Sequence, residues 1–378
     1  MGRTQGGLKV NLNSAGWSAA LLGMAGLTCA FVRQQRVSKA MRELKGKVVL
    51  VVGGSRGLGY AIARELALSG ARLALTARHL DALERAKARL LASDCAAPAD
   101  VWVYPCDVSV EHEAREMVAA ATAHFGRIDV LVNDAGIIMV GPLESQTLDS
   151  FHQAMNINFF GTLHATLAVL PQMIERGQGA IVNISSIGGK VAFPHLLPYV
   201  ASKFAIAGWS QGLRAELAGK GIRVTTVSPG IMRTGSHIQA RFTGNQQQEY
   251  RWFAAAASLP GTATNATAAA RKIVRALAAG AAEISIGLQA IVAARLSNAA
   301  PELTAAMLSL ANAALPSPPR DGDPDFWQAD RSTAGKAFRG SLPKVVEHLG
   351  DRLIKSYNQE PTASTAKRPT FLAWGESS

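Results

Sequence analysis

Two residues four positions apart, Tyr199 and Lys203, could carry acid–base chemistry. On a helix this spacing places both side chains on the same face. A free tyrosine has a pKa of about 10, and a nearby ammonium group favours the phenolate and lowers that pKa. Tyr199 would then donate a proton to a carbonyl oxygen or accept one from an alcohol. Taken alone, the pair is better explained by an ordinary amphipathic helix.

A serine at the end of a predicted strand strengthens the catalytic interpretation. Ser186 follows the apolar run at 180–185 (AIVNIS) and precedes Tyr199 by thirteen positions. Its hydroxyl would hydrogen-bond the oxygen of the reacting carbonyl. We expect the adjacent Ser185 to point to the opposite face of the strand. For His195, a surface-loop position is favoured over a substrate contact.

A glycine-rich turn follows the first predicted strand, at 52–59 (VGGSRGLG). Glycines allow a tight turn, and the start of the following helix offers free N–H groups and a positive dipole to a pyrophosphate. Glycine clusters also form ordinary loops, but the strand–turn–helix context is the one that dinucleotide binding requires. The expected cofactor contacts in this turn are Gly53, Ser55, Arg56, Gly57, Leu58 and Gly59.

The charge around the second predicted strand favours NADP(H) over NAD(H). An acidic residue at the end of that strand would accept the ribose 2′-hydroxyl of NAD, but the chain reads Thr76-Ala77-Arg78 there. Arg56 lies in the turn itself, and two guanidinium groups can hold a phosphate by charge-assisted hydrogen bonds. The alternative is that both arginines are solvated surface charges. We predict NADP(H) as the cofactor.

The G-x-x-x-G-x-G spacing of the turn resembles the short-chain dehydrogenase/reductase family, whose other motifs follow in order between about residues 45 and 286. The matching positions are Asp107-Val108, Asn133-Asp134-Ala135-Gly136, Asn158, Ser186, Tyr199 with Lys203, and Pro229-Gly230-Ile231 with Thr234. The resemblance implies a catalytic set of Asn158, Ser186, Tyr199 and Lys203. It also implies cofactor contacts at Asp107, Val108, Asn133, Ala135, Gly136, Tyr199, Lys203, Pro229, Gly230, Ile231 and Thr234.

The resemblance also implies roles for individual residues. Lys203 would hold the nicotinamide ribose, and Asn158 would anchor a water that links Lys203 to solvent. Two positions depart from the family pattern, because Val52 replaces a threonine and Asp134 replaces the second asparagine. We expect these departures to weaken loop hydrogen bonding without removing the chemistry. The family resemblance further implies a homo-oligomer.

Strands and helices alternate along the chain, which predicts an α/β fold with a Rossmann-type, doubly wound parallel sheet of about seven strands and helices on both faces. The predicted strands lie at 47–52, 72–76, 101–106, 128–133, 180–185, 223–228 and 283–286. We predict a single catalytic domain at 41–290. A helical extension and flexible tail would follow at 291–378, with a helix at 290–315 that is apolar on one side and another helix at 344–357.

The net charge of +12 is concentrated near the N-terminus. Residues 1–47 hold eight Lys or Arg and one Glu, next to the uncharged stretch 11–32. A bilayer span needs about 20 residues, and the basic residues that follow would keep the catalytic domain in the cytoplasm. We predict that residues 1–40 are a membrane anchor that acts through 14–32. The alternatives are a cleaved signal peptide and an apolar N-terminus that docks on the protein itself. The charge covers no domain face, so nucleic-acid binding is not expected.

The three cysteines, Cys29, Cys95 and Cys106, form no CxxC pair and have no histidine at ligand spacing, so neither a disulfide framework nor a metal site is expected. Segment 231–259 is the candidate lid over the substrate. Its apolar and aromatic residues are Met232, Ile238, Phe242, Trp252 and Phe253. They predict a bulky, lipophilic carbonyl or alcohol as the small-molecule substrate.

The sequence thus predicts an NADP(H)-dependent oxidoreductase that interconverts a carbonyl and an alcohol. The alternative is a catalytically idle NADP(H)-binding sensor or scaffold at a membrane. The complete set of Asn158, Ser186, Tyr199 and Lys203 favours the enzyme.

Overall fold

The computed structural model describes residues 39, 41–259, 263–319, 333–338 and 340–360. The apolar segment 14–32, which the sequence predicts to be a membrane anchor, lies outside the described residues.

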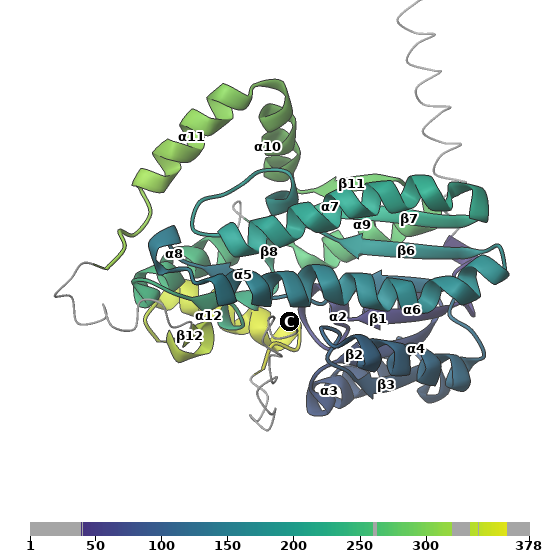
Figure 1. The fold of residues 1–378 in the computed structure, drawn as a ribbon. Coiled ribbons are helices and arrows are strands. Elements are labelled where there is room, and N and C mark those ends of the chain that lie inside the picture. The colour runs from purple at the N-terminus through teal and green to yellow at the C-terminus, as the bar shows by residue number, and fades with distance from the viewer. Residues whose placement is uncertain (1–38, 40, 260–262, 320–332, 339, 361–378) are drawn as a thin grey trace, which may run out of the picture.

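A seven-stranded parallel sheet forms the centre of the molecule, in the order β11-β7-β6-β4-β1-β2-β3 (Figure 1). The strands are β1 Val48–Val52, β2 Arg72–Ala77, β3 Val101–Pro105, β4 Val130–Asn133, β6 Gly179–Ile184, β7 Ile222–Pro229 and β11 Glu283–Ile286. All seven predicted strands are present. The direction of the strand order reverses between β1 and β4, which is the switch point where doubly wound sheets bind ligands.

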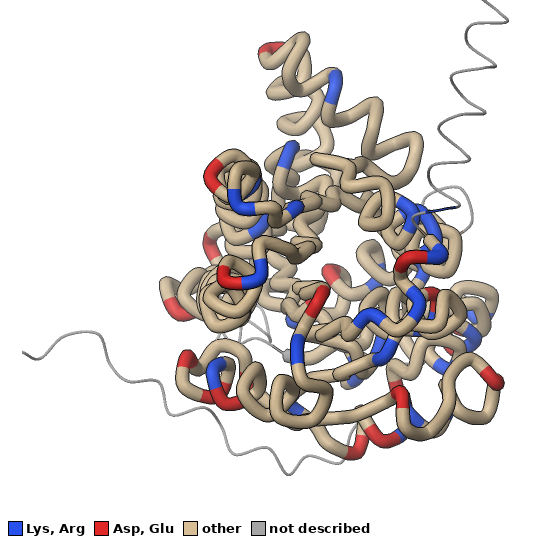
Figure 2. Tube along the Cα trace, turned by 90° about the vertical axis from the view of Figure 1, so that its right-hand side faces the viewer, with Lys and Arg blue, Asp and Glu red and all other residues tan. Residues whose placement is uncertain are grey.

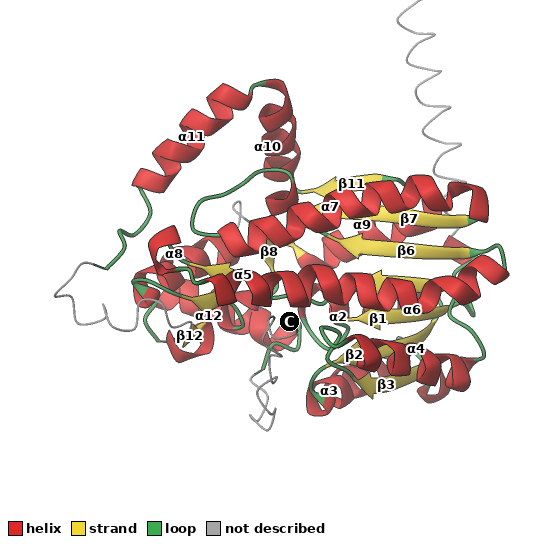
Figure 3. Ribbon diagram, in the orientation of Figure 1, coloured by secondary structure: helices red, strands yellow, loops and turns green. Residues whose placement is uncertain are grey.

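Helices cover both faces of the sheet, as the continuous apolar strands require (Figure 3). One face packs against α2 Gly57–Leu68, α3 Leu80–Ala92 and α9 Ala266–Ala279. The other face packs against α4 Glu111–Phe125, α6 Gly161–Glu175 and the end of α7 Leu197–Leu217. Val49, Leu50 and Val51 of β1 have no exposed surface, because the strand is buried on both sides.

The helix predicted near 155–176 starts earlier and changes its winding. It consists of α5 Leu148–Ala154, a π-helical segment Met155–Phe160 and α6. π-Helical turns inside α-helices are frequent at functional sites, and this one carries the buried Asn158. Leu148–Glu175 is also the one described helix that is long and apolar enough to cross a membrane. Because α6 packs on the sheet, we assign this helix to the layers of the fold.

A cover lies over the carboxyl ends of the strands. It is formed by β8 Met232–Arg233, a 3-10 turn Ser236–Ile238, β9 Arg241–Phe242 and α8 Gln246–Ser258. β9 pairs with β5 Met139–Val140 and with β12 Thr333–Ala334, and β8 pairs with β10 Thr264–Asn265. The predicted lid residues separate into two groups. Ile238 and Phe242 are fully buried, whereas Met232, Trp252 and Phe253 line a pocket beneath the cover.

After β11 the chain forms a projecting arm and then returns. The arm consists of α10 Leu288–Ala299 and α11 Pro301–Ala313, which stand away from the sheet (Figure 1). The prediction of one continuous helix here was wrong, because Pro301 opens a new helix after Ala300. The helix predicted at 344–357 is present as α12 Lys344–Ser356, and it packs against α8 of the cover.

Candidate active site

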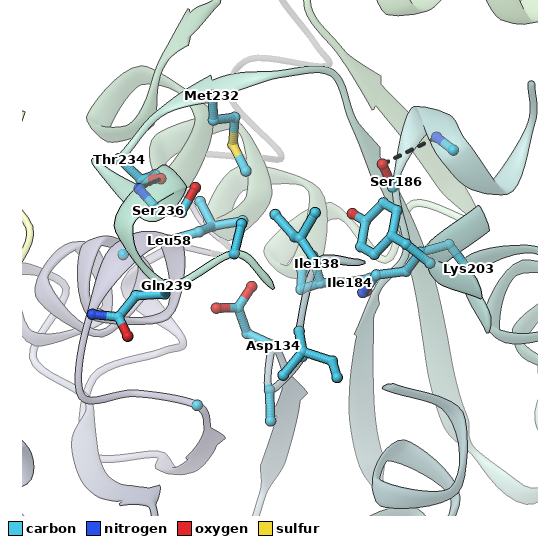
Figure 4. Close-up of a pocket in the computed structure, with 18 of the residues that line it drawn as sticks. Leu58, Asp134, Ile138, Ile184, Ser186, Lys203, Met232, Thr234, Ser236 and Gln239 are labelled. Carbon is cyan, nitrogen blue, oxygen red and sulfur yellow. Dashed lines mark hydrogen bonds between the residues drawn. The ribbon is translucent and has the colours of Figure 1, made fainter. Parts of the chain in front are cut away.

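The carboxyl edge of the sheet opens into a pocket of about 490 Å³ beneath the cover (Figure 4). All the predicted cofactor contacts line this pocket except Gly59 and Asn133. Those in the pocket are Gly53, Ser55, Arg56, Gly57, Leu58, Arg78, Asp107, Val108, Ala135, Gly136, Tyr199, Lys203, Pro229, Gly230, Ile231 and Thr234. Positions that are far apart in the sequence therefore share one cavity.

The phosphate turn is packed too tightly for side chains at two of its glycines. Gly53 has a φ of +91°, and a Cβ there would lie 2.6 Å from the backbone nitrogen of Ala135. A Cβ on Gly59 would lie 2.2 Å from the carbonyl oxygen of Gly53, so Gly59 packs against the backbone of the turn. Its role is therefore to let the turn close, and it does not line the pocket. Helix α2 begins at Gly57, immediately after the turn. This backbone cradle at a helix N-terminus fits a dinucleotide pyrophosphate.

Positive charge gathers at the adenosine end of the pocket. Burial, together with the neighbouring Arg78 and Arg85, lowers the pKa of Arg56 to about 10. The guanidinium therefore remains charged at neutral pH. The nearby carboxylate of Asp81 forms an ion pair with Arg85, at 2.9 Å between Oδ2 and Nη1. Arg78 is exposed at the pocket edge, where no acidic residue ends β2.

At the opposite end of the pocket, β6 and α7 bring Ser186, Tyr199 and Lys203 together. The Ser186 hydroxyl hydrogen-bonds Tyr199 and also accepts a 3.0 Å hydrogen bond from the Gly188 N–H. The Lys203 ammonium lies 5.6 Å from the centre of the Tyr199 ring, and it donates to the Ile184 carbonyl oxygen at 2.9 Å. This arrangement can present a phenol and a second hydroxyl to one substrate oxygen, with a cation beside the phenol ring.

Burial raises the pKa of Tyr199 to about 12, and the hydrogen bond from Ser186 offsets only part of this effect. The prediction that Lys203 lowers the pKa of Tyr199 was wrong for the protein without a bound cofactor. Burial lowers the pKa of Lys203 itself, while the nearby Asp134 opposes that change. Tyr199 is therefore protonated at neutral pH, which suits a proton donor.

Asp134, which departs from the family pattern, lies between the phosphate turn and Lys203. Its carboxyl group points into the cavity (Figure 4), and burial raises its pKa against the opposing effects of Lys203 and the Gly59 N–H. Its backbone N–H donates to the Val52 carbonyl oxygen at 2.9 Å. The sequence placed Asp134 in a structural motif and did not predict a buried carboxyl group beside Lys203.

Two of the predicted asparagines lie behind the pocket wall. Asn158 accepts a 2.7 Å hydrogen bond from the Ile137 N–H and donates to Ser202 Oγ at 2.8 Å. Asn133 donates to Asn183 Oδ1 at 2.9 Å, between strands β4 and β6. These contacts fix the floor of the site.

His195 is neither a surface residue nor a pocket residue, so the surface-loop interpretation was wrong. It is buried, and its Nδ1 lies 2.8 Å from the Glu249 carboxylate, which also accepts a 2.7 Å hydrogen bond from Trp252 Nε1. These contacts tie the loop before α7 to the cover. The Ser185 hydroxyl donates to the Lys203 carbonyl oxygen at 2.8 Å, so it points to the helix backbone, away from the position of Ser186.

Several pocket residues escaped the sequence analysis. The apolar wall around the catalytic end includes Ile137, Ile138, Phe193, Leu196, Ala311 and Leu315, and Gln359 closes the side of the phosphate turn. No motif marks these positions, because they come from loops, the arm and the C-terminal segment.

The described residues contain no cluster of three or more His, Cys, Asp or Glu side chains arranged to hold a metal ion. Cys95 and Cys106 are buried free thiols, and burial raises the pKa of Cys106 to about 12.

A doubly wound sheet, a glycine-rich phosphate turn and a Ser–Tyr–Lys group that faces the same pocket are typical of nicotinamide-dependent oxidoreductases. The family model for short chain dehydrogenases matches residues 47–243, which is more than half of the chain. The protein therefore belongs to the short-chain dehydrogenase family. It is an oxidoreductase of the alcohol/carbonyl type with a nicotinamide-binding fold.

Individual relatives agree with this assignment. The chain is 38% identical over 205 residues to a dehydrogenase/reductase SDR family protein 7-like of Drosophila melanogaster, covering 54% of this chain and 63% of the fly protein. It is 40% identical over 191 residues to the D-threitol dehydrogenase of Mycolicibacterium smegmatis, covering 50% of this chain and 72% of that enzyme. A short-chain dehydrogenase from Burkholderia phymatum, solved in complex with NAD, superposes with a TM-score of 0.63 at 26% identity, covering 69% of this chain and 96% of that one.

Proposed function

We propose that this protein is an NADP(H)-dependent oxidoreductase that interconverts a carbonyl and an alcohol on a bulky apolar substrate at a membrane. The observation that carries the proposal is the difference in charge and chemistry between the two ends of this pocket. One end holds the cations Arg56 and Arg78, and the other end holds Ser186, Tyr199 and Lys203.

NADP(H) bound in this pocket supplies or accepts the hydride. In the direction of reduction, the protonated Tyr199 donates its proton to the substrate oxygen, and the Ser186 hydroxyl hydrogen-bonds that oxygen as negative charge develops on it. The Lys203 ammonium lies close enough to stabilise the tyrosinate that remains. In oxidation, the same tyrosinate removes the alcohol proton. Asn158 acts as a positioning residue, because it holds Ile137 and Ser202 beside these groups.

The choice of NADP(H) rests on uncompensated positive charge. Arg56, Arg78 and Arg85 repel one another, and Asp81 neutralises only one of them. A ribose 2′-phosphate would bring about two negative charges and several acceptor oxygens into this cluster. NAD(H) would bring neither, and β2 ends without the carboxylate that its 2′-hydroxyl would need.

The arm supports a membrane position and an apolar substrate. Leu303, Met307 and Leu310 of α11 are 53%, 53% and 75% exposed, and no residue of that helix is buried. Few residues of the arm are charged (Figure 2), and Arg295 and Glu302 are the charged residues of α10 and α11. A helix that is apolar on its exposed surface favours the bilayer interface.

The arm also connects this surface to the site, since Ala311 and Leu315 line the pocket. A bilayer that contacts α11 would therefore lie beside the pocket mouth. The predicted anchor at 14–32 would also hold the protein at the membrane. The name of D-threitol dehydrogenase points to a polar substrate, and we infer a different preference here from the apolar wall of the pocket.

Titration of the full-length protein with NADPH and NADH tests the cofactor, with nicotinamide fluorescence and thermal unfolding as readouts. Tight binding of NADPH and weak binding of NADH is the expected result, and the reverse preference would overturn the NADP(H) assignment. A screen of lipophilic carbonyls against small polar ones then tests the substrate class. Turnover of the small polar compounds alone would contradict the apolar preference.

The Tyr199→Phe variant separates an enzyme from a sensor or scaffold. An enzyme would lose turnover while it still binds NADPH. If the wild-type protein binds NADPH but reduces no carbonyl in the screen, the idle sensor becomes the better explanation.

A further inference from the structure

The chain folds back onto the phosphate turn after α12. We call residues 357–359 the C-terminal hook. Asn358 adopts the left-handed conformation with a φ of +54°, and the Gln359 N–H donates to the Ile354 carbonyl oxygen at 2.9 Å. This pattern is a helix-ending motif that reverses the chain direction. It turns the hook away from α12 and toward the start of α2.

The hook is fastened to the backbone of the phosphate turn. The Tyr357 carbonyl oxygen accepts a 2.8 Å hydrogen bond from the Gly57 N–H. The Asn358 side chain donates to the carbonyl oxygens of Ser55 and Ala82, at 2.6 and 3.0 Å. In the turn itself, the hook contacts backbone groups, namely the Gly57 N–H and the Ser55 carbonyl oxygen. The hook therefore holds the shape of the turn without contacts to the turn's side chains.

The hook is also joined to the cover. Gln239, which lines the pocket, donates from Nε2 to the Gln359 carbonyl oxygen at 3.2 Å. Both sides of the cofactor pocket thus meet at the hook.

Gln359 is the member of the hook that lines the pocket. Its side chain is 3% exposed, and its Nε2 lies 2.8 Å from the position that a Cβ on Gly57 would occupy. Its Oε1 is buried without a hydrogen-bond partner among the described residues. Buried amide groups are normally paired, so this carboxamide is placed for a partner that enters the pocket.

We propose that Gln359 is a ligand of the cofactor's pyrophosphate group and that the C-terminal hook completes the dinucleotide site. The carboxamide can rotate to direct its NH₂ group at a phosphate oxygen, and its oxygen can accept a hydrogen bond from a ribose hydroxyl. The neutral amide adds a donor to those of the turn without adding charge. The proposal rests on dinucleotide binding alone, and it needs neither the NADP(H) preference nor the apolar substrate.

Calorimetric titration of the full-length protein with cofactor fragments tests this assignment without turnover. ADP-ribose contains the pyrophosphate, whereas 2′-AMP lacks it. Adenosine replaces 2′-AMP if the protein prefers NAD(H). The variants are Gln359→Leu, which keeps the approximate size and removes the amide, and Gln359→Glu, which places a carboxylate beside the phosphates. Ser356→Ala, at an exposed position of α12, is the matched control.

We expect Gln359→Leu to weaken ADP-ribose binding about tenfold, because a hydrogen bond to a charged group is lost. Binding of 2′-AMP should change less than twofold. Gln359→Glu should weaken ADP-ribose binding further, and this additional loss should shrink at high salt. Ser356→Ala should behave as the wild type with both probes.

Wild-type affinity of Gln359→Leu for ADP-ribose would overturn the proposal. So would an equal loss for ADP-ribose and 2′-AMP, since that pattern indicates a purely structural role. If Gln359→Leu does not fold, Gln359→Asn, which retracts the amide by one methylene, provides the same comparison. If the wild-type protein binds neither ADP-ribose nor NADPH, that result would instead contradict the proposed function itself.

Discussion

The carboxyl edge of the sheet and the cover above it form one pocket, but they are built by different means. Ser186 closely follows the buried strand β6, and Tyr199 lies in the first turn of α7. The cover, the arm and the hook are short pieces, and side-chain contacts such as Gln239 with Gln359 and His195 with Glu249 join them to each other and to the main fold. The main fold therefore positions the catalytic groups, whereas the shape of the pocket around them depends on contacts between distant segments.

The largest effect is expected on kcat, from a substitution at the carboxyl edge of the sheet. Tyr199→Phe removes the proton donor, and general acid catalysis contributes about 10²–10⁴ in rate, so we expect kcat to fall about a thousandfold. The affinity for NADPH should stay within about twofold of the wild type, because the phenyl ring still fills the site. Steady-state kinetics and fluorescence titration measure both quantities.

Tyr104→Phe is the control for that substitution, since Tyr104 lies on β3 and stacks on Trp102 away from the pocket. A loss in Tyr104→Phe comparable to that in Tyr199→Phe would show that the effect is structural, and the distinction between the two regions would fail.

The next largest effect is expected on cofactor preference, from a substitution at the arginine end of the pocket. Arg78→Asp removes a phosphate contact and supplies an acceptor for the ribose 2′-hydroxyl, so the ratio of NADPH to NADH affinity should fall about a hundredfold. Competitive titration with the two cofactors measures this ratio. Arg115→Asp makes the same charge change at an exposed position of α4 and should leave the ratio unchanged. An unchanged ratio in Arg78→Asp would remove the arginine cluster from cofactor selection.

A smaller effect is expected in the arm. A chain that begins at Lys39 lacks the predicted anchor, so any remaining vesicle binding would come from other parts of the chain. Replacing Leu303, Met307 and Leu310 with Gln in this chain should weaken binding to lipid vesicles about tenfold or more, because each exposed side chain loses apolar burial at the interface. Vesicle flotation measures the bound fraction.

Leu148→Gln is the control for the arm, because Leu148 is 71% exposed on α5 and lies outside the arm. Equal loss of binding in the control and the arm variant, or no loss in either, would rule out the arm as the membrane contact.

The smallest effect is a pH-dependent change in stability at the catalytic end. Burial raises the pKa of Tyr199 to about 12, so the folded state keeps a proton that the unfolded chain releases above pH about 10. This contribution is fully present below pH about 10 and is lost as the pH rises toward 12. Between pH 9 and 11 the wild type should lose about 1 kcal/mol more unfolding free energy than Tyr199→Phe.

Urea unfolding at each pH measures that difference. Identical pH profiles for the two proteins would show that the folded state does not hold the Tyr199 proton more tightly than the unfolded chain does.

The sequence predicted the sheet well, because buried parallel strands are continuous apolar runs and the turns between them carry glycines. It also identified most of the pocket residues that lie at strand ends, since motif spacing there reflects the local backbone. It failed for His195, whose partner Glu249 lies in another element. It also gave the wrong direction for the pKa of Tyr199, because burial of the phenol raises that pKa and the sequence pattern does not record burial.

The order of the strands and helices, the phosphate turn and the spacing of Ser186, Tyr199 and Lys203 follow from the amino-acid sequence alone. These features depend on local periodicity and on glycine conformations that neighbouring residues specify. The tertiary fold alone brings the Asp134 carboxyl group between Gly59 and Lys203, Ala311 of α11 to the pocket and Gln359 to Gly57. Such contacts join residues that are tens to hundreds of positions apart, and packing selects them through shape and burial, which no local pattern records.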